Sequence, residues 1–211
     1  MSVHHFEILV EEPSMEALLR LLLPRVLTGL TFEVYPYSCK DELLALLPQR
    51  LSGYARRRTN DSWFRNHCRI AVLMDCDQDD CERLKGQLET MAADAGLLTR
   101  SGAIGRPYVV ANRIAIEELE AWYFGDWEAV RRAYPKVPPT IPSKAKFRDP
   151  DAIRGGTWEV FERVLQQAGY FKTGLRKIEA ACAIASQMVP ERNTSRSFQV
   201  FHEVVREMAA A

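Results

Sequence analysis

The chain has 211 residues, of which 47% are hydrophobic, and its 28 basic residues balance its 28 acidic residues to a formal net charge of +0. This suffices for one well-cored domain, or for one domain with an appended lobe. No stretch approaches the about 18 consecutive apolar residues of a membrane span. The five cysteines form no CxxC pair, which disfavours a zinc site or a disulfide framework. We therefore expect a protein of the reducing cytoplasm with no membrane partner.

Residues 1–130 alternate between strand-like and helix-like patterns. Strands are predicted at 6–10, 31–35, 69–74 and 108–115, and helices at 15–23, 41–51, 79–96 and 117–124. Ser14 is expected to cap the first helix, and Arg56–Arg58 are expected to lie in an exposed loop. Strands that alternate with helices predict an α/β fold with a mostly parallel central sheet of about four strands.

The pattern changes after residue 130. Four prolines fall between residues 135 and 142, and an irregular polar segment follows at 144–156. Helices are predicted at 158–168, 174–188 and 198–208. We expect residues 131–211 to form a helical extension packed on the 1–130 domain as one compact unit.

Charge is distributed unevenly between these two parts. Residues 131–211 hold 14 Lys and Arg against 8 Asp and Glu, so residues 1–130 carry the acidic surplus. Such a division suits a metal site beside a phosphate-binding surface, or a solvated helical lobe that is rich in arginine.

The most informative stretch is residues 70–79, in which five apolar residues run into Asp75, Asp77 and Asp79. The apolar run is typical of a strand buried on both faces. The acids would then lie at its carboxyl end, where open α/β sheets bind ligands. If the backbone stays extended, Asp75 and Asp77 point to the same side. Carboxylates this close repel one another unless a cation lies among them, and their oxygens suit Mg²⁺ or Mn²⁺.

Acidic clusters follow two other predicted strands as well. The three clusters are Glu11, Glu12 and Glu16; Asp75, Asp77, Asp79 and Asp80; and Glu117, Glu118 and Glu120. Parallel strands would bring all three to one edge of the sheet, with Glu117 and Glu120 on one helical face. Glu16, Asp79 and Asp80 also suit first-turn or capping positions of the following helices, without any ligand.

The order of these motifs resembles the Toprim fold of topoisomerases, bacterial primases and overcoming-lysogenization-defect nucleases. Leu9–Glu11 matches the glutamate after the first strand, and Asp75–Asp77 matches the later Asp-x-Asp. More narrowly, the chain resembles small bacterial Toprim-like proteins of unassigned function encoded beside ATPases. That similarity runs through 9–16, 72–85, 112–122 and 193–198.

The resemblance implies a Mg²⁺- or Mn²⁺-dependent endonuclease that cleaves DNA or RNA with an ATPase partner in phage defence. Glu11, Asp75 and Asp77 would bind metal, Glu16 would assist catalysis, and Asp79 with Glu117 or Glu120 would hold a second ion. One departure is Glu12, where the family usually has glycine. It motivates the alternative of a non-catalytic adaptor that binds an ATPase. Self-association is left open.

Basic and aromatic residues complete the set of candidates. Arg113 is expected to pair with the acids or to meet a phosphate, and Arg196 to bind a phosphate at a helix N-terminus. Asn193 or Ser195 could instead simply cap that helix. Trp122, Tyr123, Phe124 and Trp127 are expected in the core where the helical part docks.

Overall fold

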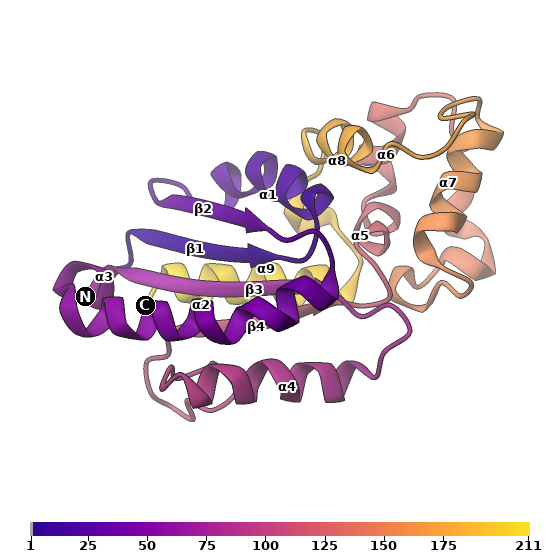
Figure 1. Ribbon diagram of the computed structural model, residues 1–211. Helices are drawn as coiled ribbons and strands as arrows, with labels where there is room; N and C mark the ends of the chain where they lie inside the picture. Colours follow the sequence, from indigo (N-terminus) through magenta and orange to yellow (C-terminus); the bar gives the residue numbers. More distant parts are fainter. Residues whose placement is uncertain (1) are drawn as a thin grey trace.

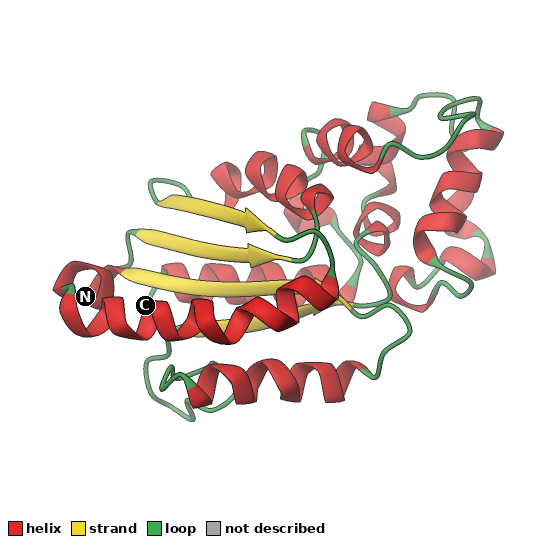
Figure 2. Cartoon of the chain, in the orientation of Figure 1, coloured by secondary structure: helices red, strands yellow, loops and turns green. Residues whose placement is uncertain are grey.

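Four parallel strands form the central sheet of the computed structural model, which describes residues 2–211 (Figures 1 and 2). They are β1 (His5–Val10), β2 (Thr31–Pro36), β3 (Cys68–Asp75) and β4 (Val110–Ala115), in the order β2-β1-β3-β4. Every residue of β3 is buried, as expected for a central strand covered on both faces. The predicted α/β class with a four-stranded parallel sheet is confirmed.

Helices cover both faces of this sheet and extend beyond one edge of it. They are α1 (Pro13–Val26), α2 (Lys40–Asn60), α3 (Ser62–His67), α4 (Cys81–Asp94), α5 (Glu120–Gly125), α6 (Trp127–Ala133), α7 (Thr157–Gln167), α8 (Lys177–Ala185) and α9 (Arg196–Ala209). Figure 1 shows α2 and α4 on one face, α9 on the other, and α5–α8 beyond the carboxyl ends of the strands. No helix within residues 2–211 has the length and apolar character to cross a bilayer.

The hydrophobic core joins the two parts of the chain on the α1 and α9 face. Ile8 of β1 and Leu19 of α1 belong to one buried cluster with Phe161 of α7, Ala181 of α8 and Phe201 of α9. The predicted core aromatics Trp122, Tyr123, Phe124 and Trp127 are all buried in it. A second cluster, under α2 and α4, fills the opposite face of the sheet. The helical part is therefore packed on the sheet through a continuous core.

Two local predictions were wrong. Arg56–Arg58 lie within α2, which runs through Pro48 and continues for 21 residues because Leu43, Leu47, Leu51 and Tyr54 keep a buried face at helical spacing. Ser14 does not cap α1: Glu12 is the N-cap residue, and the Ser14 hydroxyl donates to its carboxylate. Pro13 occupies the first turn, where a missing N–H costs nothing.

The N-terminus of α9 is closed by side chains. Ser195 Oγ accepts from Phe198 N at 3.2 Å and donates to Asp151 Oδ1 at 2.7 Å, and Ser197 N donates to Asp151 Oδ2 at 2.7 Å. Asn193 does not cap α9 directly: its amide donates to Trp122 O at 2.8 Å and its Oδ1 accepts from Ser195 N at 2.9 Å. Of the two capping candidates, Ser195 is the cap.

Substitution of this cap tests the packing of α9. Ser195→Ala removes the acceptor for Phe198 N and leaves Asp151 with one partner fewer. We expect a loss of about 1 kcal/mol in the free energy of unfolding, measured by urea denaturation. Thr194→Ala, whose hydroxyl bonds only to Gly125 O among the described contacts, is the neighbouring control. A Ser195→Ala protein as stable as the wild type would contradict this account of the cap.

Candidate functional site

Glu11 and Asp75 meet at the carboxyl edge of the sheet. Glu11 follows β1 and Asp75 ends β3, and the two strands are paired in parallel register. Glu11 Oε2 accepts a hydrogen bond from Asp75 N at 2.8 Å, while Asp75 Oδ1 is buried and has no partner. Burial raises the pKa of Glu11 to about 7 and lifts the pKa of Asp75 well above its usual range, with the Glu11 charge as the next cause. The two acids are thus held together in an environment that disfavours their charge.

Glu120, at the start of α5, adds a third buried carboxyl to this group. It is 1% exposed, its Oε2 has no partner, and burial raises its pKa to about 7. Its charge acts on Asp75, as does that of Glu12. Among the described residues, these acids do not bring three ligand atoms within 4.8 Å of one another, so the buried pair of Glu11 and Asp75, and not a preformed triad, is the candidate cation site.

Lys177 reaches this group from α8, which belongs to the helical extension of residues 131–211 (the helical lobe). Its Nζ lies 3.4 Å from Glu12 Oε2. Its pKa is raised despite burial by the charges of Glu120, Glu12 and Asp75, in that order. The backbone at Glu12 is extended, with φ −140° and ψ 159°, a conformation open to any residue. Glu12, which stands where the Toprim pattern usually has glycine, therefore requires no strained turn, and it pairs with a lysine.

Asp77 and Glu117 lie on left-handed backbone beside the buried pair. Their φ angles are 51° and 57°, and Asp77 N donates to Glu117 O at 2.6 Å. The expectation that extended backbone points Asp75 and Asp77 to one side was wrong: the chain turns at Asp77, whose side chain is 43% exposed. The expectation that Glu117 and Glu120 share a helical face was also wrong, because α5 begins only at Glu120. The hydrogen bond between Asp77 N and Glu117 O instead links the turns that follow β3 and β4.

Lys40, at the start of α2, neutralises the exposed acids of this turn. Its Nζ lies 2.6 Å from Asp77 Oδ2 and 3.0 Å from Asp79 Oδ2, and it donates to Cys76 O at 3.0 Å. Asp79 also pairs with Arg83 Nη2 at 2.8 Å, and these cations hold its pKa below the usual range. Asp80 caps α4 by accepting from Arg83 N at 2.8 Å. Asp79 is thus committed to cations of the chain.

A cleft of about 660 Å³ opens over this turn. Its lining is Lys40, Asp77, Gln78, Asp79, Glu117, Glu118, Gly155, Gly156, Trp158 and Glu159. Gly155 and Gly156 have φ angles of 88° and 74°, and a Cβ at Gly156 would collide with the Glu159 carboxylate. Glu118 Oε2 accepts from Trp158 N at 2.7 Å, which ties this wall to the end of β4. The cleft therefore joins sheet residues to the helical lobe.

The remaining predicted residues lie apart from the buried acids. Glu16 is bound by Arg20 Nε at 2.8 Å on α1. Arg113 forms no ion pair with the acids; it lines a separate pocket of about 360 Å³ together with Lys85, Arg196 and Asp151. The α9 N-terminus beside Arg196 is already capped by Asp151 and Ser195. Arg113 and Arg196 are thus brought together, but the helix N-terminus expected beside them is not free.

Sequence reasoning overlooked Lys40 and Lys177. Lys40 follows β2, so the same edge argument that gathered the acids also places it there. Lys177 carried no comparable signal, because α8 is positioned by tertiary packing on α1 and α6.

The role of Lys177 as a counter-charge leads to a pH-dependent prediction. Lys177→Met should destabilise the protein more at pH 8 than at pH 5, because Glu120 is charged only above its pKa of about 7. Urea denaturation at both pH values measures this difference. Lys172→Met, on an exposed stretch of the same lobe, is the control. An equal loss at both pH values would contradict the role of Lys177 as a counter-charge of Glu120.

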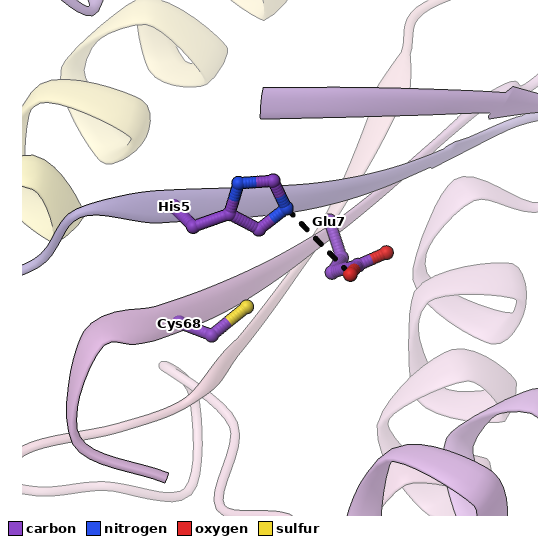
Figure 3. A group of neighbouring side chains, drawn as sticks. All are labelled: His5, Glu7 and Cys68. Atoms are coloured by element: carbon purple, nitrogen blue, oxygen red, sulfur yellow. Dashed lines mark ion pairs between the residues drawn. The ribbon is translucent and has the colours of Figure 1, made fainter. Parts of the chain in front are cut away.

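A second group of donor atoms lies at the opposite ends of β1 and β3. Figure 3 shows His5, Glu7 and Cys68, whose ligand atoms lie within 4.8 Å of one another. His5 Nδ1 is hydrogen-bonded with Thr31 Oγ1 at 2.7 Å, and His5 Nε2 faces Glu7 Oε1 at 3.6 Å.

The charges around this second group are already balanced. Glu7 accepts from Tyr54 Oη at 2.9 Å and lies 3.7 Å from Arg57 Nη1. Burial, followed by the Glu7 charge, raises the pKa of Cys68 to about 12, so the thiol keeps its proton. An ion here would have to displace that proton beside an arginine. The carboxyl-edge acids are the better candidate for a hard cation.

Comparison with known proteins identifies the family but no function. A family model described as "Domain of unknown function (DUF4276)" matches residues 10–206. No curated protein and no solved structure matches the chain significantly. Since the match spans nearly the whole chain, the protein belongs to the DUF4276 family.

Proposed function

We propose that this member of the DUF4276 family is a Mg²⁺- or Mn²⁺-dependent enzyme of Toprim type that cleaves phosphodiester bonds in DNA or RNA. The observation that carries the proposal is the buried pair of Glu11 and Asp75 at the ends of neighbouring strands. Asp75 N donates to Glu11 Oε2 at 2.8 Å, and Asp75 Oδ1 has no partner. Such a pair is costly to bury and gains stability from a divalent cation. An all-oxygen donor set also fits this class of ion better than zinc.

Glu11 and Asp75 would hold the ion, with Asp77 at the rim and Glu120 behind them. The bound ion would offset the repulsion between these carboxylates and a phosphodiester, and it would lower the pKa of water at the site. Lys40 and Lys177 flank the acids and would attract the substrate backbone. Gly155 leaves open space along the cleft where a side chain would otherwise stand.

Substrate phosphates beyond the cleft have a basic surface to contact. Lys85, Arg113 and Arg196 line the neighbouring pocket, and Arg113 Nε is buried without a partner. Guanidinium groups bind phosphate oxygens through paired N–H donors. The assignment of Arg113 and Arg196 to phosphate binding therefore stays in the proposal, whereas the assisting catalytic role expected for Glu16 is dropped because Arg20 binds it.

A non-catalytic adaptor that docks on an ATPase is the second candidate. Lys40 and Lys177 already neutralise Asp77, Asp79 and Glu12, so the acidic edge has internal counter-charges without a metal. Under either function, an ATPase partner and a role in phage defence rest on the resemblance of the sequence motifs.

One double variant separates the two candidates. Wild-type protein is incubated with supercoiled DNA and with single-stranded RNA in Mg²⁺ or Mn²⁺, alone and with any ATPase that is encoded beside it. The enzyme predicts cleavage that EDTA abolishes and that Asp75→Ala/Asp77→Ala lacks, while folding and ATPase binding persist. The adaptor predicts no cleavage by the wild type and unchanged cellular function in the double variant. Absence of cleavage of both substrates under all these conditions would overturn the nuclease proposal.

A further inference from the structure

An arginine-lined pocket of about 550 Å³ lies at the amino-terminal ends of the strands, opposite the end of the sheet that carries the acids. It is bounded by the ends of α2 and α9, by α3, and by the segments that lead into β3 and β4. Figure 1 shows the C-terminus of the chain beside α3 at this edge, where the strands begin. The lining is Arg58, Arg65, Asn66, Arg69, Arg106, Pro107, Tyr108, Val109, Glu207, Met208 and Ala211.

Two of the four arginines here carry buried nitrogens without partners. Arg69, near the start of β3, is only 8% exposed, yet its Nε bonds to nothing and its Nη1 donates only to the adjacent Cys68 O. Arg58 Nη1 on α2 is likewise buried and unpartnered. Buried guanidinium donors are normally all satisfied, so these mark a place for acceptor atoms.

No acidic side chain in the described lining is free to pair with the positive charges of this pocket. Glu207 is the one acidic side chain there, and its carboxylate accepts from Arg100 Nη2 at 2.8 Å and from Tyr108 Oη at 2.8 Å. Burial lowers the pKa of Arg58 and Arg69, and for Arg58 the neighbouring Arg69 and Arg65 charges lower it further. A cluster of like charges in this state is stabilised by a bound anion.

We propose that this pocket binds the phosphate group of a small ligand of nucleotide size. Guanidinium groups match phosphate oxygens with paired donors. The volume lies within the range of small-molecule sites, which is about 300 to 1,000 Å³. Pro107 and Val109 offer apolar surface for the remainder of the ligand.

This anion pocket is separate from the proposed catalytic edge. Arg69 and Asp75 are six residues apart on β3, which places them about 20 Å apart at the rise of a strand. A ligand bound at Arg69 therefore does not touch Glu11 or Asp75, and binding does not require a divalent ion. The inference stands whether or not the nuclease proposal holds.

Calorimetric titration in EDTA tests the pocket with pyrophosphate, a nucleoside triphosphate and a single-stranded oligonucleotide as probes. Arg65→Gln/Arg106→Gln changes two exposed arginines of the lining, so folding is not at risk. Arg163→Gln, exposed on α7, is the matched control. We expect saturable 1:1 binding of pyrophosphate or the nucleotide, weakened at least about tenfold in the double variant because each lost charged hydrogen bond is worth that much, and unchanged in the control.

Three results would overturn the proposal. The first is that neither pyrophosphate nor the nucleotide binds the wild type saturably. The second is that the double variant binds them as tightly as the wild type does. The third is that the oligonucleotide binds but pyrophosphate and the nucleotide do not. The last would assign the arginines to a nucleic-acid backbone instead. Arg69→Met, which keeps an apolar stem of similar length but removes the charge, is a second variant that should also weaken binding.

Discussion

Asp75→Asn is expected to abolish metal-dependent cleavage while making the metal-free protein more stable. The asparagine keeps the shape of the side chain but removes a charge that burial and the neighbouring acids Glu11 and Glu12 disfavour. Under the proposed nuclease function, loss of a direct ligand to the catalytic ion should lower the cleavage rate on the order of 10³-fold. The same change should raise the free energy of unfolding in EDTA at pH 8, since the buried carboxylate is gone.

Two measurements check this pair of effects. Initial rates of plasmid nicking report activity, and urea denaturation in EDTA reports stability. Asp94→Asn, exposed at the end of α4 and outside every described ion pair, is the control and should change neither. An Asp75→Asn enzyme that cuts at the wild-type rate would remove Asp75 from the site. A variant that is inactive but also destabilised would point to a structural role.

Glu120 is expected to make stability fall as pH rises through neutrality. Its pKa is 4.5 as a free group and about 7 in the fold. Between these values the native state holds a proton that the unfolded chain has lost, so the unfolding free energy decreases with pH up to about 7. The shift corresponds to about 3 kcal/mol for this group between pH 4 and pH 8. Glu120→Gln should remove that part of the slope.

The measurement is urea denaturation in EDTA at several pH values between 4 and 8. Glu120→Gln should be more stable than the wild type at pH 8, by less than the full shift because Lys177 loses an attractive charge. Glu203→Gln, exposed on α9, should leave the pH slope unchanged. Parallel pH curves for Glu120→Gln and the wild type would show that Glu120 is not held in its neutral form.

The edge of the sheet could be predicted from sequence because its determinants are local. The apolar run before Asp75 is a buried strand in the structure, and the parallel order brings the end of β1 beside the end of β3. Glu11 and Asp75 therefore meet as the strand pattern predicts. The same argument holds only in part for the acids after β4. Glu120 is buried and its charge acts on Asp75, whereas Glu117 lies in the turn that accepts from Asp77 N.

The details that failed depend on backbone geometry and on distant packing. A left-handed residue at Asp77 turns its side chain away from Asp75, and an aspartate in sequence carries no mark of that conformation. Arg56–Arg58 were expected in a loop on their charge, but the apolar spacing of α2 outweighs it. Lys177 and the arginine pocket come from elements far apart in the chain, which periodicity within one segment does not reveal.

The central claim is that Glu11 and Asp75 form a site for a divalent cation at the carboxyl edge of the sheet. A crystal of the wild-type protein soaked in Mn²⁺, with anomalous data collected at the manganese edge, tests it most directly. We predict a peak in contact with Asp75 Oδ1 and Glu11 that disappears in Asp75→Asn. A peak at His5, Glu7 and Cys68 instead, or no peak at the carboxyl edge at saturating Mn²⁺, would contradict the account.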